Sequence, residues 1–266
     1  MKLHDKQKNA GRILDQYGKV AIAFSGGADS SLLLKLALDI LGPDRVLVLT
    51  ARSCLVKPAD TRRAADWFIR HAVSPTPVHE FVDLQPLLWD DFVRNPEHRC
   101  YLCKSRIYTI FCEITRGRGF AVLADGTNAD DMNSARPGLR AIRELGIETP
   151  LAAAGLTKDE VRELSRQLGL ETWNQPSASC LATRLPTGLP VTADRLERVA
   201  GMEKYLDDAG FSGCRVRLDK HDAARVLIQV QRKDLPRIAA SPQRDYLIDF
   251  LNNMHITSVA LDLRGR

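Results

Sequence analysis

The run from Ser25 to Ser31 combines residue types that suit a phosphate-binding turn. It reads Ser-Gly-Gly-Ala-Asp-Ser-Ser and joins an apolar, strand-like stretch at 20–24 to an apolar helical start at Leu32. Two adjacent glycines let the backbone approach an anion closely, and the helix that follows adds its positive end. The run lacks the Gly-Lys-Ser/Thr of the Walker loop and the spaced glycines of the dinucleotide fingerprint. It indicates nucleotide chemistry of another kind, and the simpler alternative is a tight turn capped by Ser25.

Three of the six cysteines lie in surroundings that suit chemistry. Cys100 and Cys103 form a Cys-x-x-Cys pair with basic neighbours, which favour the thiolate that attacks electrophiles and binds metals. Cys180 lies on a Ser-rich loop, where a sulfur nucleophile could meet an activated substrate. Structural zinc is disfavoured, because no second Cys-x-x-Cys or paired histidine motif supplies the other ligands. The other three cysteines lie in or beside apolar stretches and are expected to be buried: Cys54, Cys112 and Cys214.

Strand-like and helical patterns alternate along the first two thirds of the chain. Strands are expected at 20–24, 45–50, 78–82 and 120–124, and helices at 6–17, 29–41, 58–71, 104–115 and 157–168. The last helix carries a capping box formed by Thr157 and Glu160. Such alternation predicts an α/β fold with a doubly wound parallel sheet, whose strands end at one ligand-binding edge. The loops after 24, 50 and 124 should therefore converge.

A loop rich in Ser, Pro and Gly follows residue 175 and predicts a domain boundary. We place the first domain at 1–184 and the second at 185–266. In the second, helices are expected at 193–209 and 242–252, and strands at 213–218, 225–231 and 258–263, the first two as a hairpin. This predicts a smaller C-terminal α+β domain.

Composition limits the function classes. The 266 residues are 44% hydrophobic and 27% charged, with a net charge of +5 that suits a small anionic ligand as well as nucleic acid. The 6% aromatic content and the absence of a Lys/Arg block argue against nucleic acid as a partner. No apolar run has the roughly 18 residues that span a bilayer, and the N-terminus has no apolar signal core. We expect a cytoplasmic protein with reduced cysteines and no membrane partner.

Within the run from Ser25 to Ser31, the six residues from Ser25 to Ser30 match the SGGxDS signature, and the chain resembles the PP-loop ATP pyrophosphatases. That resemblance implies that the loop grips the pyrophosphate half of ATP. It also implies that AMP is transferred to a carboxylate or carbonyl oxygen, so adenylation is the expected reaction.

Further segments resemble, in order, the LarE sulfur insertases of nickel-pincer nucleotide synthesis. Members of that family adenylate a carboxylate of pyridinium-3,5-biscarboxylic acid mononucleotide and then replace its oxygen with sulfur. The substrate implied is a small-molecule nucleotide, and a homo-oligomer is expected. The matching segments are Arg99 to Lys104, Asp125 to Asp131, Arg136 to Gly138, Gly155 to Lys158 and Pro176 to Arg184.

The family uses two sulfur-donating strategies. In one subtype a single cysteine, matched here by Cys180, gives up its sulfur and is left as dehydroalanine. The other subtype adds a Cys-x-x-Cys pair, matched by Cys100 and Cys103, so that three thiolates hold a 4Fe-4S cluster with one open iron. Such a cluster could hand over sulfur. The resemblance to this three-cysteine pattern favours the cluster, with the sacrificial route as the alternative.

Nucleotide-binding roles follow from position within the resemblance. Adenine and ribose are expected near Thr50 and Arg52, and Gly126 and Asn128 would complete the nucleotide pocket. Magnesium needs one or two carboxylates beside phosphate, which makes Asp29, Asp130 and Asp131 candidates; the alternative for the last two is a solvated turn. The ATP phosphates and the start of the adenosine are assigned to Ala23, Phe24, Ser25, Gly26, Gly27, Asp29 and Ser30.

Four arginines are candidates for the substrate phosphate and carboxylates, because a guanidinium fork binds either one bidentately. Arg215 and Arg217 alternate along a strand and would share a face; the alternative is an exposed edge-strand face. The candidates are Arg184, Arg215, Arg217 and Arg225.

Three other functions stay open on sequence alone. A tRNA-thiolating PP-loop enzyme would need an RNA-binding surface. An ATP-binding sensor would not need three thiols, and an amidotransferase-type ligase would have to use free ammonia.

Overall fold

A computed structural model describes residues 2–132, 137–176 and 179–266, and its contacts divide the chain into two compact units. Unit 1 comprises Met1–Gln85 and His98–Gln175, and unit 2 comprises Pro86–Glu97 and Pro176–Arg266. The division into functional domains at 184 stays a prediction.

Unit 1 is built on a four-stranded sheet that is parallel throughout, as predicted, in the order β3-β2-β1-β4. The strands are β1 (Val20–Ala23), β2 (Val46–Arg52), β3 (Val78–Asp83) and β4 (Leu123–Asp125). The helices are α1 (Leu3–Tyr17), α2 (Ala28–Leu41), α3 (Pro58–Ala65), α4 (Trp67–Arg70), α6 (Arg99–Gly117), α7 (Ala129–Met132), α8 (Pro137–Glu144), α9 (Pro150–Ala153) and α10 (Lys158–Gln167). The 3₁₀ turns are η1 (Pro43–Arg45) and η3 (Glu171–Asn174).

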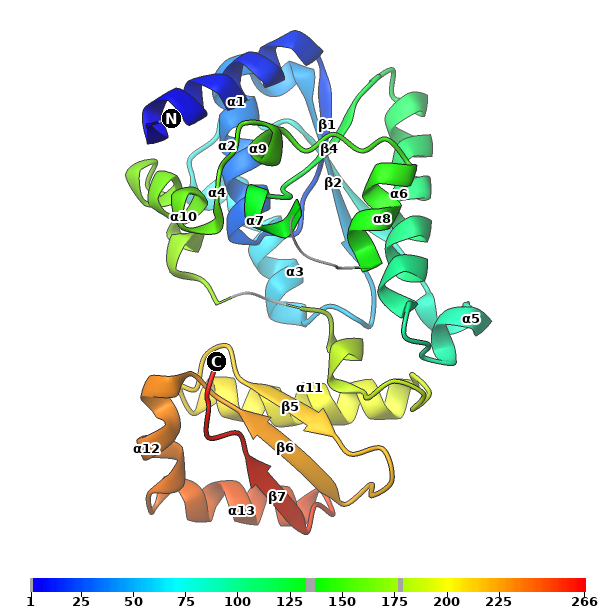
Figure 1. Ribbon diagram of the computed structural model, residues 1–266, viewed down its shortest axis with the longest axis vertical. Coiled ribbons are helices and arrows are strands. Elements are labelled where there is room, and N and C mark those ends of the chain that lie inside the picture. The colour runs from blue at the N-terminus through cyan, green and yellow to red at the C-terminus, as the bar shows by residue number, and fades with distance from the viewer. Residues whose placement is uncertain (1, 133–136, 177–178) are drawn as a thin grey trace. The chain divides into compact units, whose positions relative to one another are not determined.

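Both faces of the sheet are covered by helices, because both faces are apolar. Val20 and Ile22 of β1 belong to the core under α1, α2 and α10, whereas Ala21 belongs to the core under α6 and α8. Figure 1 shows these two groups of helices on opposite sides of β1, β2 and β4. Alternate residues of one strand thus enter different cores, which explains why the strands read as continuous apolar runs. The predicted doubly wound α/β class is confirmed.

Three helix predictions need correction in their bounds. The helix expected at 6–17 begins earlier, at Leu3. The helix expected at 58–71 is interrupted at Asp66, which separates α3 from α4. The helix expected at 104–115 begins earlier, at Arg99, so the Cys-x-x-Cys pair lies in its first turns.

Unit 2 contains the hairpin predicted from the sequence. Strands β5 (Arg215–Leu218) and β6 (Arg225–Gln229) are antiparallel, and β7 (Ser258–Leu261) pairs with β6 in parallel. The helices are α5 (Asp90–Val93), α11 (Ala193–Asp208), α12 (Leu235–Ala239) and α13 (Gln243–Asn253), with 3₁₀ turns η2 (Pro86–Leu88), η4 (Leu181–Arg184) and η5 (Arg232–Asp234). Met202, Val216, Ile228 and Leu251 lie in its core.

A short excursion of the chain, Pro86–Glu97, belongs to unit 2. The fully buried Asn95 holds it there by donating to Pro186 O at 2.8 Å and Leu189 O at 2.6 Å. Gly188 N in turn donates to Asn95 O. No pattern in the sequence indicated this excursion.

The burial predictions for three cysteines have mixed outcomes. Cys214 is 1% exposed and Cys112 packs half-buried against the core under α6. Cys54 is exposed, so the prediction for it is wrong. It lies just beyond β2, where the neighbouring Leu55 is buried instead. Among the helices described, none is both long enough and apolar enough to cross a membrane.

The capping box at α10 is confirmed, and it gives a testable contribution to stability. Thr157 Oγ1 accepts from Glu160 N at 3.3 Å, and Glu160 Oε2 accepts from Thr157 N at 2.9 Å. We expect Thr157→Ala to lower the free energy of unfolding by about 1 kcal/mol. Thr109→Ala, at an exposed mid-helix position, is the matched control and should change it by less than about 0.5 kcal/mol in urea titrations. Equal losses in the two variants would contradict the capping role.

Candidate functional site

The loop between β1 and α2 leaves backbone N–H groups open to an anion. Ser30 Oγ organises the loop: it accepts from Ser25 N at 3.3 Å, lies 3.1 Å from Ser25 Oγ and donates to Gly27 O at 3.2 Å. Helix α2 begins at Ala28, and its N-cap Gly27 offers no side-chain cap. The N–H groups of a first turn have no partner within the helix. A phosphate could therefore bind to them with the positive end of α2 behind it.

Two glycines are required by close backbone contacts around this loop. Gly26 has φ +71°, and a Cβ there would lie 3.2 Å from the Cβ of Ala64 on α3. At Gly126, which follows β4, a Cβ would lie 2.7 Å from Ser30 N and 2.8 Å from the Asp29 carbonyl carbon. The loop is thus enclosed by backbone on two sides, which fits the predicted pocket role of Gly126.

Asp29 and Asn128 lie together, and a lysine joins them. Asn128 Nδ2 donates to Asp29 Oδ1 at 3.1 Å, and Lys158 Nζ donates to Asp29 Oδ2 at 2.5 Å. Lys158 was assigned no role from the sequence. One signal could have found it: a lysine in the first turn of a helix opposes the helix dipole, which indicates that it serves a partner elsewhere.

The other two candidate magnesium ligands are used by nearby backbone. Asp130 Oδ2 accepts from Lys158 N at 2.8 Å, and Asp131 Oδ2 accepts from Asn128 N at 3.3 Å. Asn128 Oδ1 accepts from the N–H groups of both aspartates. Over the described ranges, no group of three or more His, Cys, Asp or Glu is arranged to hold a metal ion. The magnesium roles stay predictions.

Thr50 and Arg52 lie at the end of β2 with different surroundings. Thr50 is 4% exposed, and its Oγ1 donates to Phe24 O at 2.9 Å. His79 Nε2 lies 2.8 Å from the same oxygen, so the histidine must donate and carries its proton on Nε2. Arg52 is exposed and pairs bidentately with Asp83. Thr50 therefore holds the backbone of Phe24, the residue that directly precedes the loop. The sequence did not predict this contact.

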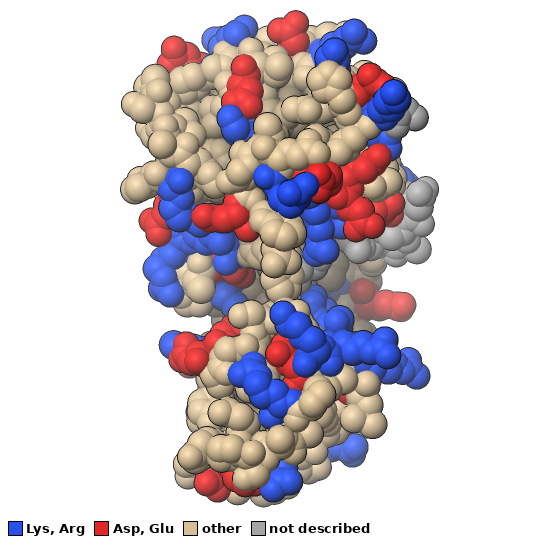
Figure 2. Space-filling model, turned by 90° about the vertical axis from the view of Figure 1, so that its left-hand side faces the viewer, with Lys and Arg blue, Asp and Glu red and all other residues tan. Residues whose placement is uncertain are grey.

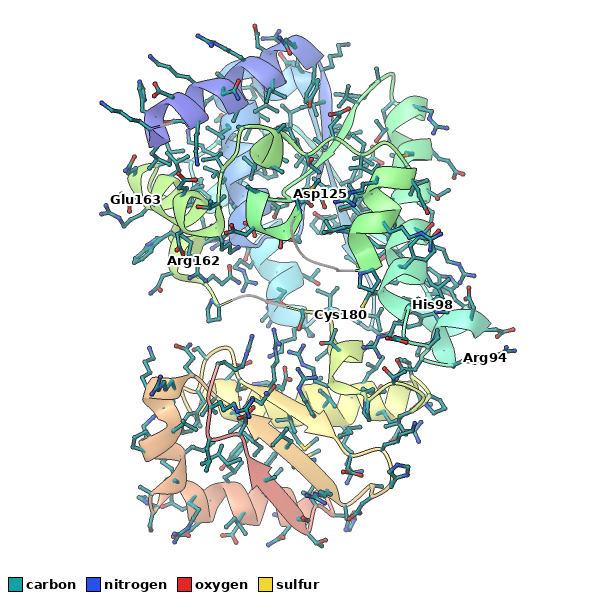
Figure 3. The ribbon with its side chains drawn as sticks, viewed as in Figure 1. Arg94, His98, Asp125, Arg162, Glu163 and Cys180 are labelled. Atoms are coloured by element: carbon teal, nitrogen blue, oxygen red, sulfur yellow. The ribbon has the colours of Figure 1, made fainter. Side chains whose placement is uncertain are left out.

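A buried carboxylate lies at the end of β4 (Figure 3). Asp125 accepts from Tyr108 Oη and from Thr127 N at 2.7 Å, and Lys104 Nζ lies 3.4 Å away. Burial alone would raise the pKa of Asp125, but Lys104 and these hydrogen bonds outweigh it, so the pKa lies below its usual range. Burial and this negative charge raise the pKa of Tyr108, which stays protonated. The ionised Asp125 thereby holds Lys104, the residue after Cys103, against the sheet.

The first two candidate thiols lie on one turn of α6. Cys100 and Cys103 are three residues apart, hence on the same helix face, and both are half-exposed. Two accessible thiols on one face suit iron or a shared metal as a donor pair. Cys180, also half-exposed, precedes η4 in unit 2. The structure therefore brings two of the three thiols together within a unit, and the three-thiol set stays a prediction.

Arg184 is engaged within unit 2. It is 3% exposed and its Nε and Nη2 donate to both oxygens of the buried Glu203 at 2.7 and 3.0 Å. Its Nη1 donates to Ser179 O, Ser179 Oγ and Thr183 Oγ1, and to Cys180 O at 3.2 Å. The structure thus gives Arg184 the task of holding the loop that carries Cys180; its predicted contact with substrate is untested.

The other arginines lie on the sheet of unit 2. Arg215 and Arg217 share the face of β5 opposite the buried Val216, as predicted. Arg217 donates to Gln229 Oε1 at 2.9 Å and to Thr183 O. Burial and the nearby cations, first among them Arg266, lower the pKa of Arg215 to about 10. Arg225 is exposed at the start of β6. Figure 2 shows Lys and Arg side chains gathered on one part of this unit, a surface that suits an anionic ligand.

Parts of two matched segments lie outside the described residues. These are Arg136 of the Arg136 to Gly138 segment, and Ser177 and Ala178 of the Cys180 loop.

Protonation of His79 should couple stability to pH. Burial lowers the pKa of His79 to about 4, against 6.5 when it is unfolded. Between these values the unfolded chain binds a proton that the folded chain does not, so stability is complete above about pH 6.5 and falls as the pH drops toward 4. Between pH 4 and pH 6.5 we expect the free energy of unfolding to change by up to about 1.4 kcal/mol per pH unit. His79→Gln should lack this contribution of His79 over the same pH range. Urea unfolding at pH 7 and pH 5 measures it; identical curves would contradict the assignment.

Gly126 should tolerate no side chain. We expect Gly126→Ala to cost about 1–3 kcal/mol of stability and to weaken ATP binding, because its Cβ would press on the backbone of the loop. Gly117→Ala, at the end of α6 with nothing within 4 Å, is the matched control and should lose neither. Urea unfolding and ATP titration report the two effects. Wild-type ATP affinity in Gly126→Ala would show that the contact has no bearing on the site.

Comparison with known proteins gives relatives that cover most of the chain, although no protein-family model matches it. The chain is 35% identical over 209 residues to the pyridinium-3,5-bisthiocarboxylic acid mononucleotide synthase of Lactiplantibacillus plantarum, a match that covers 78% of this chain and 74% of the relative. An uncharacterised Synechocystis protein, slr1717, is 31% identical over 99% of this chain and 95% of its own length.

A more distant similarity is to an enzyme of another kind. A component of the glutamine-hydrolysing GMP synthase of Thermoplasma volcanium is 30% identical over 178 residues, 60% of this chain and 54% of the relative. The parallel sheet, the Ser25–Ser30 loop and the similarity to the synthase all indicate the same family. The chain belongs to the LarE family of adenylating sulfur transferases, within the PP-loop ATP pyrophosphatases.

Proposed function

We propose that the protein inserts sulfur into pyridinium-3,5-biscarboxylic acid mononucleotide, through an acyl-adenylate, in nickel-pincer nucleotide synthesis. The proposal is supported by the similarity to the Lactiplantibacillus plantarum synthase over 78% of the chain. The observation that carries it is the Ser25–Ser30 loop, whose open N–H groups lie beside Asp29, Asn128 and Lys158.

The first step is adenylation. A substrate carboxylate oxygen attacks the α-phosphorus of ATP, the bond to the β-phosphate oxygen breaks, and pyrophosphate leaves. A carboxylate nucleophile is already deprotonated, so no general base is required. The contribution of the protein is electrostatic: N–H groups at the start of α2 stabilise phosphate charge in a position fixed before reaction. Asp29 would be a candidate ligand for magnesium, which would neutralise negative charge on the phosphates.

The second step delivers sulfur, and two routes fit the cysteines. In the sacrificial route the Cys180 thiolate attacks the acyl carbon and AMP leaves with the carboxylate oxygen. Loss of the Cys180 α-proton to solvent then breaks its Cβ–Sγ bond, leaving dehydroalanine in the chain and the sulfur on the substrate. In the other route Cys100, Cys103 and Cys180 would hold a 4Fe-4S cluster, which would supply a sulfide at its open iron. The Cys-x-x-Cys pair on α6 favours the second route.

The two steps should separate in a mutant. We expect wild-type protein to release pyrophosphate from ATP when the biscarboxylic acid mononucleotide is present, and Cys180→Ala to retain this release while forming no thiocarboxylate. Adenylation depends on unit 1, whereas Cys180 lies in unit 2. Coupled pyrophosphate detection and mass spectrometry of the product measure both steps. No release with this substrate would refute the proposal, and release with tRNA in its place would favour the thiolating alternative.

The metal content of the purified protein distinguishes the two sulfur routes. Anaerobically purified protein should contain iron and acid-labile sulfide, and Cys100→Ala should lose both. Cys112→Ala, on the same helix, is the matched control and should keep them. Iron-free protein whose Cys180 loses the mass of hydrogen sulfide on turnover would establish the sacrificial route instead. The cytoplasmic location and the homo-oligomer stay predictions.

A further inference from the structure

An arginine on α3 lies against the phosphate-binding loop and has no assigned role. Arg63 Nε donates to Gly26 O at 3.3 Å, and Arg63 Nη2 donates to Asp60 Oδ1 at 2.5 Å. The side chain of Arg63 is 24% exposed. The next residue, Ala64, is 1% exposed and packs on Gly26. Helix α3 and the loop are therefore in direct contact, and the guanidinium is fixed beside the glycines.

A second neutral oxygen faces the same guanidinium. With the Gln175 amide oriented so that its oxygen points toward Arg63, that oxygen lies 3.0, 2.5 and 3.1 Å from Nε, Nη2 and Nη1. Arg63 is thus held by one carboxylate, Asp60, and by two neutral oxygens. A guanidinium has five N–H donors in a fork that matches a phosphate group. Hydrogen bonds to ionised acceptors are about twice as strong as those to neutral ones.

We propose that Arg63 binds the β- and γ-phosphates of ATP, and then the pyrophosphate product, by exchanging its contacts with Gly26 O and Gln175 Oε1 for charged phosphate oxygens. The proposal rests on the ATP site of the proposed function. The N–H groups that would bind the anion begin next to Gly26 in the sequence. Arg63 already donates to the Gly26 carbonyl, so its guanidinium lies near that position. Because the pyrophosphate gains negative charge as its bond to the α-phosphorus breaks, a cation at this position stabilises the leaving group.

Lys158 does not make this role redundant. Its ammonium is paired with the Asp29 carboxylate at 2.5 Å, so it balances a charge of the protein itself. Arg63 reaches the loop from α3 through Gly26, whereas Lys158 reaches it from α10 through Asp29. Its neighbour Arg62 lies on the same helix and is exposed, which provides a control of the same residue type.

The test measures binding of three probes, ATP, pyrophosphate and AMP, to wild-type protein, Arg63→Gln and Arg62→Gln by calorimetry. We expect Arg63→Gln to weaken ATP and pyrophosphate at least about tenfold, the loss of one charge-assisted contact, and AMP less than about twofold. AMP has no β- or γ-phosphate for Arg63 to bind. Arg62→Gln should leave all three affinities unchanged. Arg63→Lys, which keeps the charge without the fork, should lie between wild type and Arg63→Gln, and it replaces that variant should Arg63→Gln fail to fold.

Two results would overturn the proposal and leave the proposed function standing. One is an equal loss for AMP and ATP, which would mean that Arg63 only shapes the loop through Gly26. The other is an unchanged affinity for pyrophosphate. Wild-type protein that binds neither ATP nor pyrophosphate would overturn the proposed function together with this inference.

Discussion

The site depends on backbone packed against backbone around residues 25–30. Gly26, which has a positive φ, packs tightly on Ala64 of α3, and Gly126 lies so close to Asp29 and Ser30 that a Cβ would clash with their backbone. Because both contacts involve main-chain atoms, the loop cannot shift without moving the start of α2 or the end of β4. Its N–H groups are consequently held in place before any ligand arrives, and this preorganisation lets them stabilise developing phosphate charge without reorganising.

The charges around the loop are arranged by the ends of parallel strands. Asp125 ends β4 and Asn128 follows it, Thr50 lies near the end of β2, and Asp29 lies in the first turn of the helix after β1, so that three strand ends supply one region. Each charge has a partner from another element: Lys104 from α6 for Asp125, and Lys158 from α10 for Asp29. Phosphate chemistry at this edge therefore requires that the helices on both faces of the sheet be in place. The charges at this edge are therefore balanced only when the helices of unit 1 are folded against the sheet.

The sequence predicted what depends on local pattern and missed what depends on distant contacts. The loop, the parallel sheet and the Thr157 capping box follow from a few adjacent residues, and all are present. The pair of Lys158 with Asp29 joins residues 129 positions apart, and periodicity carries no signal for it. Periodicity likewise carries no signal for Asn95, whose side chain donates to the backbone of Pro186 and Leu189, more than 90 positions away. Cys54 illustrates the opposite error, since apolar neighbours in sequence do not decide which side of a turn faces solvent.

The backbone around Cys180 is held by the buried ion pair of Arg184 with Glu203. Burying an ion pair costs free energy, because both charges lose their hydration. Two charges removed from water recover their desolvation only with full hydrogen bonding, and Arg184 achieves this with Glu203 on one side and the Ser179–Thr183 segment on the other. Glu203 Oε1 also accepts from Val216 N, so the pair ties the loop to both α11 and β5. An apolar core contact could stabilise unit 2 equally well but would not orient the Cys180 carbonyl. Under the proposed function Cys180 delivers or holds sulfur, and a fixed backbone at Cys180 would then hold its thiol in one direction.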